Sequence, residues 1–257
     1  MSLAEQTYEM SRRSVLQIIR QPALVIPPIL FPLVLMGINV GGLNAATKLP
    51  GFPGDSYLDF SIAFPFIQGA LFASINAGSA VARDVETGFL KRLALTPMVR
   101  AAMLLGQTAG VFCVAVVSSL IYLTVGFIFG LHFAAGVGGV LAMFVLGVLI
   151  ALAFASLGTF LGLRSGSTEG VQGIFPVLFV LIFLSSGSLP RDLIQQDWFR
   201  TIATYNPVSY LFEGLRSPVL FGWQAKELLL GYGIALVIAG VGVAGATTAL
   251  RTRLARA

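Results

Sequence analysis

The side chains able to do charge chemistry are few, and the densest group lies in one short stretch. Residues 83–100 read RDVETGFLKRLALTPMVR, in which Asp84 and Glu86 precede Lys91 and Arg92. Acidic residues toward the start and basic residues toward the end favour a short helix, because they complement the helix dipole. Its apolar residues could face a partner protein, although spacing alone favours an ordinary solvated loop.

The remaining polar residues do not form a recognisable reaction centre. A phosphate-binding loop, G-x-x-x-x-G-K-[ST], needs serine or threonine after its lysine, but the lysines here precede leucine, arginine and glutamate. The 11 acidic residues lie in loops or at the ends of apolar runs, and the one histidine and one cysteine lack partners at metal-binding spacing. We therefore expect no catalytic residue, no metal and no bound nucleotide in this chain, and no enzyme activity of its own.

The elements that carry these loops are apolar. The 257 residues are 56% hydrophobic and 11% charged, whereas a soluble chain has about 25% charged residues. The 63 residues between Arg100 and Arg164 contain no Lys, Arg, Asp or Glu. This uncharged run is too long for one span and suits two helices joined near His132. Four further uncharged runs each suit one span. The chain is therefore predicted to be all-α, a single transmembrane domain with spans at about 22–43, 59–82, 101–129, 136–163, 170–189 and 228–250.

The basic residues predict the orientation of these six spans. Of the 16 Lys and Arg residues, eleven fall on the side that carries both termini and five on the other. The positive-inside rule then places both termini in the cytoplasm. The net charge of +5 is thus divided between two sides of a membrane and does not indicate nucleic-acid binding.

Two segments outside the spans are predicted to be helical. Residues 4–20 place apolar residues opposite charged ones around a helix. They suit an amphipathic interfacial helix, or equally a helical lead-in to the first span. Residues 190–227 contain three prolines and two tryptophans but are too apolar for a free loop. We expect one or two short helices there, at or dipping into the outer leaflet.

The span interiors hold no ionisable group, which argues against coupling to an ion gradient. Their polar residues are amides, Ser and Thr. The pairs Gly126/Gly130 and Gly158/Gly162 place small residues four apart, which permits close helix packing. Energy for any transport should therefore arrive from outside the spans, through the charged loop.

Two stretches resemble one known family. Residues 86–97, ETGFLKRLALTP, look like the cytoplasmic loop of ABC-2 type permeases, the membrane subunits of one class of ABC exporters. Residues 206–216, NPVSYLFEGLR, are similar to the segment before the last span of that family. The resemblance covers essentially the whole chain, and the nearest branch looks like the daunorubicin-resistance-type drug exporters.

The resemblance implies a fold and a set of partners. Residues 4–20 would be the amphipathic connecting helix, residues 83–100 the coupling loop, and residues 190–227 the external re-entrant helices. Two such permeases would pair as a homodimer, with a heterodimer left open. Two separate ABC ATPase subunits would dock on the cytoplasmic side and bind ATP and Mg. The coupling residues would be Glu86, Gly88, Lys91, Arg92 and Pro97, and the external gate would include Asn206, Pro207 and Glu213.

The second and fifth spans would line the transport path. The second span carries Phe64, Gln68, Phe72 and Asn76 at a spacing of four, and the fifth carries Phe175, Phe179 and Phe183 at the same spacing. An aromatic stripe with a few amides suits apolar or amphipathic cargo, although each ring could equally pack or face lipid.

The sequence therefore predicts the permease subunit of an ATP-driven exporter in the plasma (inner) membrane, moving hydrophobic or amphipathic drug-like compounds or lipids by alternating access. Two alternatives stay open. One is export of a lipid-linked polysaccharide, and the other is an autonomous ion-coupled transporter or channel.

Overall fold

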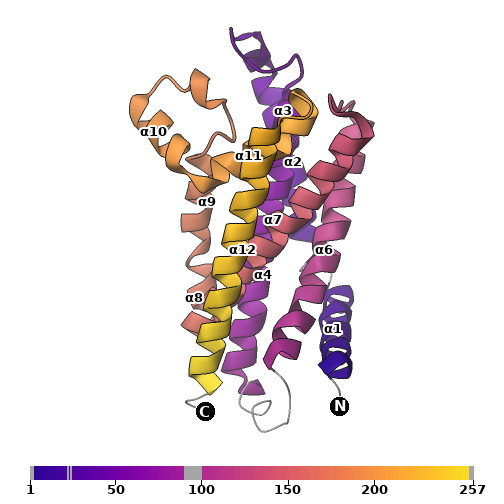
Figure 1. Ribbon diagram of the computed structural model, residues 1–257, viewed down its shortest axis with the longest axis vertical. Coiled ribbons are helices and arrows are strands. Elements are labelled where there is room, and N and C mark those ends of the chain that lie inside the picture. Colours follow the sequence, from indigo (N-terminus) through magenta and orange to yellow (C-terminus); the bar gives the residue numbers. More distant parts are fainter. Residues whose placement is uncertain (1–2, 22, 24, 90–99, 255–257) are drawn as a thin grey trace.

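The computed structural model describes residues 3–21, 23, 25–89 and 100–254, and these contain helices, turns and loops without a strand. This confirms the predicted all-α class. The described elements in Figure 1 are α1 (Leu3–Arg20), α2 (Ile26–Leu43), η2 (Asn44–Lys48), α3 (Tyr57–Ser61), α4 (Ala63–Glu86), α6 (Arg100–Ile128), α7 (Gly136–Ser165), α8 (Thr168–Gln172), α9 (Phe175–Phe183), η3 (Arg191–Leu193), α10 (Asp197–Tyr205), α11 (Pro207–Leu220) and α12 (Ala225–Leu254).

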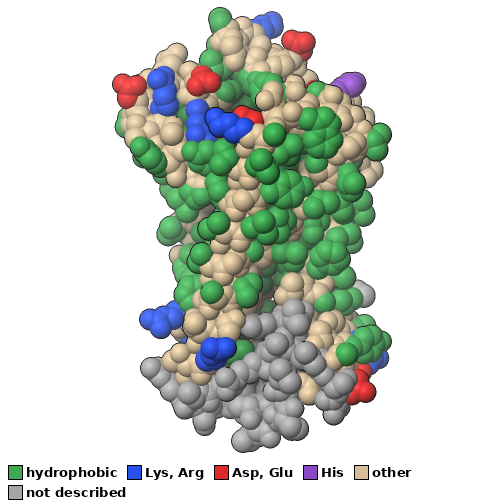
Figure 2. Space-filling view, viewed as in Figure 1, with side chains coloured by type: hydrophobic (Ala, Val, Ile, Leu, Met, Phe, Trp, Pro, Cys, Tyr) green, Lys and Arg blue, Asp and Glu red, His purple; other side chains and the backbone are tan. Residues whose placement is uncertain are grey.

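The long helices lie side by side along the long axis of the molecule (Figure 1). Figure 2 shows an apolar belt across the middle of the visible face, with Lys, Arg, Asp and Glu gathered at its two ends. In the described part of the chain, five helical segments are long and apolar enough to cross a membrane: Ile26–Lys48, Tyr57–Glu86, Gly106–Ile128, Gly136–Ser165 and Ala225–Arg253. The chain is thus a multi-pass membrane protein.

The fifth predicted span, 170–189, is not one continuous helix. It consists of α8 and α9, separated at Gly173 and Ile174, and the apolar helical stretch Thr168–Phe183 is too short to count with the five. Pro176 accounts for the break, because a proline has no backbone N–H to continue the helix from α8 but is tolerated in the first turn of a new one. α9 then ends at Phe183, where the following residues turn.

Other boundaries also differ from the predicted ranges. The predicted span 59–82 is preceded by the short helix α3, and α4 continues to Glu86, so the charged stretch 83–100 begins inside a helix. Between 190 and 227 the structure has η3, α10 and α11, and α12 begins at Ala225. Ten of the fourteen α11 residues are buried, so this helix belongs to the core rather than to a surface loop.

Close contact between α4 and α7 forms the centre of the bundle. Gly158 faces the backbone of Ser74, and Gly162 faces the backbone of Gly78. Because none of these glycines carries a side chain, the two backbones touch directly. α1 lies against α6 near the two chain ends, and α12 packs along α7 (Figure 1).

Candidate functional site

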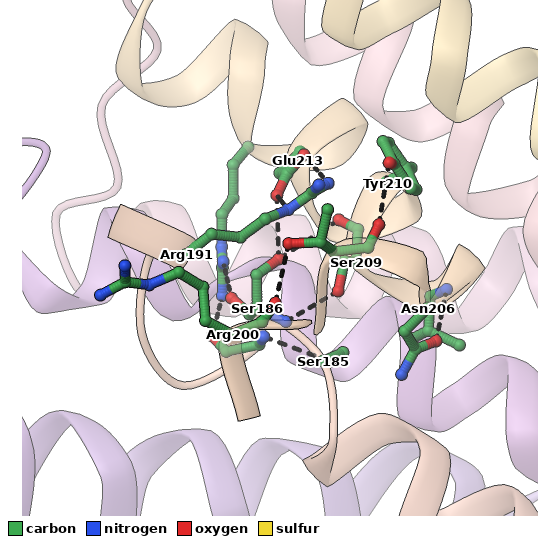
Figure 3. A network of polar contacts seen from close by, with 12 residues as sticks. Ser185, Ser186, Arg191, Arg200, Asn206, Ser209, Tyr210 and Glu213 are labelled. Atoms are coloured by element: carbon green, nitrogen blue, oxygen red, sulfur yellow. Dashed lines mark hydrogen bonds and ion pairs between the residues drawn. The ribbon is translucent and has the colours of Figure 1, made fainter. Parts of the chain in front are cut away.

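The end of the bundle opposite the chain termini is held by a polar network, shown in Figure 3. Glu213 of α11 accepts two hydrogen bonds from Arg191, at 2.7 Å from Nε and 2.6 Å from Nη2. Ser186 Oγ donates to the same carboxylate at 3.1 Å. Burial by itself would lower the pKa of Arg191, but hydrogen bonding and charge interactions with Glu213 and Tyr210 together outweigh this and place that pKa above its ordinary value. The two charges therefore form a fixed bidentate pair.

Arg216 lies one turn further along α11 and is only 3% exposed. Its Nε donates to the carbonyl of Phe60 at 2.7 Å, and its two Nη atoms donate to the carbonyls of Ser186, at 2.7 Å, and Gly187. The guanidinium carbon is 3.6 Å from the centroid of the Phe60 ring, an attractive cation–π arrangement. Burial lowers the pKa of Arg216, yet arginine stays protonated in proteins. A buried cation thus joins α11, α3 and the turn after α9.

Asn206, a predicted gate residue, connects two helices. Its Oδ1 accepts from the backbone N–H of Val208 at 2.9 Å and so caps the start of α11. Its Nδ2 donates to the carbonyls of Leu181 and Leu184, at 2.7 and 3.0 Å, at the end of α9. Pro207, the next predicted gate residue, occupies the first turn of α11, where proline is favoured. The structure therefore brings Asn206, Pro207 and Glu213 together on α11, and their role as a gate stays a prediction.

Five phenylalanine rings form a continuous series, which we name the aromatic ladder: Phe31, Phe72, Phe175, Phe179 and Phe183. Phe31 of α2 meets Phe72 of α4 at 5.7 Å between centroids, and Phe72 meets Phe175 of α9 at 6.0 Å. Along α9 the ring centroids are 5.5 Å and then 4.9 Å apart. The two end rings are exposed and the three inner ones half-buried. Most of the rings predicted for the path therefore lie together.

The other predicted path residues lie apart from the aromatic ladder. Phe64 is buried and packs against Phe212 of α11, 5.0 Å between centroids. Gln68 is also buried, and its Oε1 has no hydrogen-bond partner among the described residues. Asn76 faces a cavity toward the end that holds the termini. Spacing by four on α4 thus does not place all four residues against α9.

At the termini end, the structure gives Glu86 a partner within its own chain. Its carboxylate accepts from the backbone N–H of Thr168 at 2.7 Å and from Thr168 Oγ1 at 3.2 Å. Thr168 begins α8, so Glu86 joins the end of α4 to the segment that leads into α9. Gly88 follows with a positive φ of 67°, which favours glycine. Three predicted coupling residues lie outside the described residues: Lys91, Arg92 and Pro97.

Sequence reasoning missed several residues that the structure places at these contacts. Charge and spacing assign no role to Arg191, Phe31, Ser186 or Thr168, and Arg216 enters only as part of the segment 206–216. One signal was available. Arg216 follows Glu213 by three residues inside the apolar run VSYLFEGLRSPVLF, and a charge in such a run needs a buried partner.

A family model described as ABC-2 type transporter matches residues 5–220. A protein named transport permease ycf38 from Pyropia yezoensis is 28% identical over 84% of this chain and 74% of its own length. A protein named doxorubicin resistance ABC transporter permease DrrC from Mycobacterium tuberculosis is 28% identical over 77% of this chain and 69% of its own length.

Proposed function

The chain belongs to the ABC-2 type transporter family, and we propose that it is the permease subunit of an exporter for apolar or amphipathic compounds. Family membership makes it a membrane transport component that works with ABC ATPase subunits. The finer assembly is part of the proposal. Two copies of this chain pair, two ATPases dock at the end that holds the termini, and ATP and Mg bind to the ATPases. We infer that this end faces the cytoplasm, because the sequence assigns eleven of the 16 basic residues to the side of the termini.

The observation that carries the cargo class is the aromatic ladder. Its rings run from α2 through α4 to the end of α9, and Phe183 is 49% exposed. Val177 and Val180 are exposed on another side of α9, so this helix leaves apolar surface beside the aromatic ladder for a second copy or for cargo. Aromatic rings with few polar neighbours favour drug-like compounds over sugars. The similarity to a doxorubicin resistance permease points the same way.

The Glu86–Thr168 contact supports a route by which ATPase movement reaches the aromatic ladder. The contact lies where α4 gives way to the charged stretch, and α8 leads within a few residues to Phe175. A push on that stretch would then shift α8 and α9 together.

Purification tests the assignment to an ATP-driven complex. Co-expression of the tagged chain with its cognate ABC ATPase should yield a stable complex with ATPase activity in lipid vesicles. The chain reconstituted without the ATPase should move no cargo. Transport by the lone chain down an ion gradient would instead support an autonomous transporter.

Replacing Glu86 with alanine should lower cargo-stimulated ATPase activity about two- to fivefold. The reason is the loss of an exposed charge-assisted contact of about 0.5–1 kcal/mol. The matched control is Glu169→Ala, since Glu169 is an exposed acid on α8 with no side-chain partner among the described residues. Basal ATPase activity should stay unchanged in both variants, and the melting temperature of Glu86→Ala should fall by no more than about 4 °C. Equal losses in the two variants would remove the special role of Glu86.

Replacing Phe179 with leucine should raise the drug concentration for half-maximal ATPase stimulation about three- to tenfold. Leucine keeps the side chain apolar but ends the ring contacts on both sides, each contributing about 0.5–1.5 kcal/mol. Phe127→Leu is the control, because Phe127 pairs with Phe133 outside the aromatic ladder. An unchanged response in Phe179→Leu, or stimulation by polyprenyl-linked sugars only, would contradict the proposed cargo.

A further inference from the structure

A cavity of about 560 Å³ lies inside the bundle of a single chain, toward the end that holds the termini. Its walls come from α1, α4, α6, α7 and α12, with Val25 at the start of α2. α9 contributes no lining residue, so the cavity is separate from the aromatic ladder. Val243 of α12 lines it and is 54% exposed, which places an opening on the apolar outer surface. The volume falls in the range of small-molecule sites.

The cavity is long and changes character along its length. On α4 its lining runs from Ala73 to Asp84, about 16 Å of helix, and Thr87 lines it just after the helix ends. The deep half is lined by small and apolar side chains, including Ala77, Val114 and Leu149. A long apolar channel of this kind suits an alkyl chain.

The mouth of the cavity is charged. Arg13 of α1 donates to Asp84 of α4 at 3.1 Å, and its guanidinium carbon is 4.2 Å from the centroid of the Phe89 ring. Arg83 also lines the mouth, is exposed, and makes no ion pair within the described residues. The charged residues that line the cavity are thus two arginines and one carboxylate, so the lining has a net positive charge.

Gln107 of α6 adds a third observation. It lines the cavity, and its buried Oε1 has no hydrogen-bond partner among the described residues. A buried polar atom without a partner is unfavourable by about 1–3 kcal/mol. A hydroxyl group of a ligand in the cavity would supply the missing donor.

We propose that this cavity binds one anionic phospholipid, with its phosphate at Arg83 and Arg13 and an acyl chain along α4 toward Leu149. The positive mouth selects the phosphate charge, the apolar half takes the chain, and a headgroup hydroxyl reaches Gln107. The lipid enters beside α12 from the leaflet in which α1 lies. The site does not depend on transport, so binding can be measured without any cargo.

Native mass spectrometry of the full chain in mild detergent tests the site. Titration with dioleoyl-phosphatidylglycerol should show one tightly bound equivalent, with at least fivefold weaker binding of dioleoyl-phosphatidylcholine. Arg83→Gln should weaken phosphatidylglycerol binding about fivefold, since one basic residue near a lipid headgroup contributes about 1 kcal/mol. Ala77→Phe, which fills the channel, should abolish that equivalent.

Matched variants separate the site from general effects. Arg251→Gln removes an exposed arginine of α12 outside the cavity, and Ala244→Phe adds a ring on its exposed surface. Both should bind phosphatidylglycerol like the unaltered chain. Equal affinity for the two lipids, or unchanged binding in Ala77→Phe, would overturn the proposal. Displacement of the lipid by inorganic phosphate at comparable concentration would instead assign a free-anion site. If Ala77→Phe fails to fold, the phosphatidylglycerol affinities of Arg83→Gln and Arg251→Gln are compared, and equal affinities would overturn the proposal.

Discussion

Replacing Arg216 with methionine is expected to lower the free energy of unfolding by about 3–5 kcal/mol. Methionine fills a similar volume but donates no hydrogen bond, so the carbonyls of Phe60, Ser186 and Gly187 lose their shared donor. Each buried carbonyl left without a partner is unfavourable by about 1–3 kcal/mol. The measurement is the shift in the unfolding midpoint of the purified chain in detergent.

Arg200→Met is the matched control. Arg200 also donates to a backbone carbonyl, that of Ile194, at 3.0 Å from Nε and 2.6 Å from Nη2. Unlike Arg216, however, Arg200 is exposed. Water replaces such contacts readily, so the loss should stay below about 1 kcal/mol. Similar losses in the two variants would mean that Arg216 is no more important than a surface arginine.

The second large effect is expected for Gly158→Val. A Cβ at Gly158 would lie 1.8 Å from the carbonyl oxygen of Ser74, and one at Gly162 would lie 2.2 Å from that of Gly78. Backbone atoms cannot rotate away as a side chain does, so valine must push α7 from α4. Overpacking a core is unfavourable by about 1–3 kcal/mol and more where the backbone must move. We expect a loss of about 3 kcal/mol or more, seen as a collapse in the yield of monodisperse protein.

Gly240→Val is the control for this variant. Gly240 also lies inside a long membrane helix, α12, but a Cβ there would meet nothing within 4 Å. Its yield and melting temperature should match those of the unaltered chain within experimental error. A folded, stable Gly158→Val protein would show that α4 and α7 do not need direct backbone contact.

The sequence predicted best what depends on local composition. The uncharged residues 101–129 and 136–163 are occupied by α6 and α7, because length and hydropathy alone decide whether a segment can cross a membrane. Small-residue spacing was less specific. Gly158/Gly162 meets α4, whereas Gly130 of the pair Gly126/Gly130 lies in a turn with φ of 90°.

The break between α8 and α9 shows where hydropathy fails. Residues 170–189 are uncharged throughout and predict one span, yet the helix is interrupted at Gly173 and Ile174 and ends at Phe183. At that second point the carbonyls of Leu181 and Leu184 accept hydrogen bonds from Asn206, 22 residues or more away. Composition cannot reveal that a side-chain amide distant in sequence donates hydrogen bonds to the carbonyls that the next helical turn would otherwise satisfy. Gly173 and Pro176 were visible hints, but both residues also occur inside continuous membrane helices.

For the candidate site, spacing found what lies on one helix and missed what several helices assemble. The period of four identified the rings of α9, but Phe31 joins them only because α2 packs beside α4. In the sequence, Arg216 is one of five basic residues on the side away from the termini. Its burial follows from α3, α11 and the turn after α9 meeting at one point, which no local pattern encodes.

The hydrogen bonds of Asn206 also compensate the partial charges at two helix ends, the end of α9 and the start of α11. The carboxyl end of a helix carries a partial negative charge and the amino end a partial positive charge, of about half an elementary charge each. Asn206 presents its amide N–H group to the end of α9 and its amide oxygen to the start of α11. One neutral side chain therefore compensates two opposite helix dipoles, and the chain can interrupt a helix here without adding an ionised group.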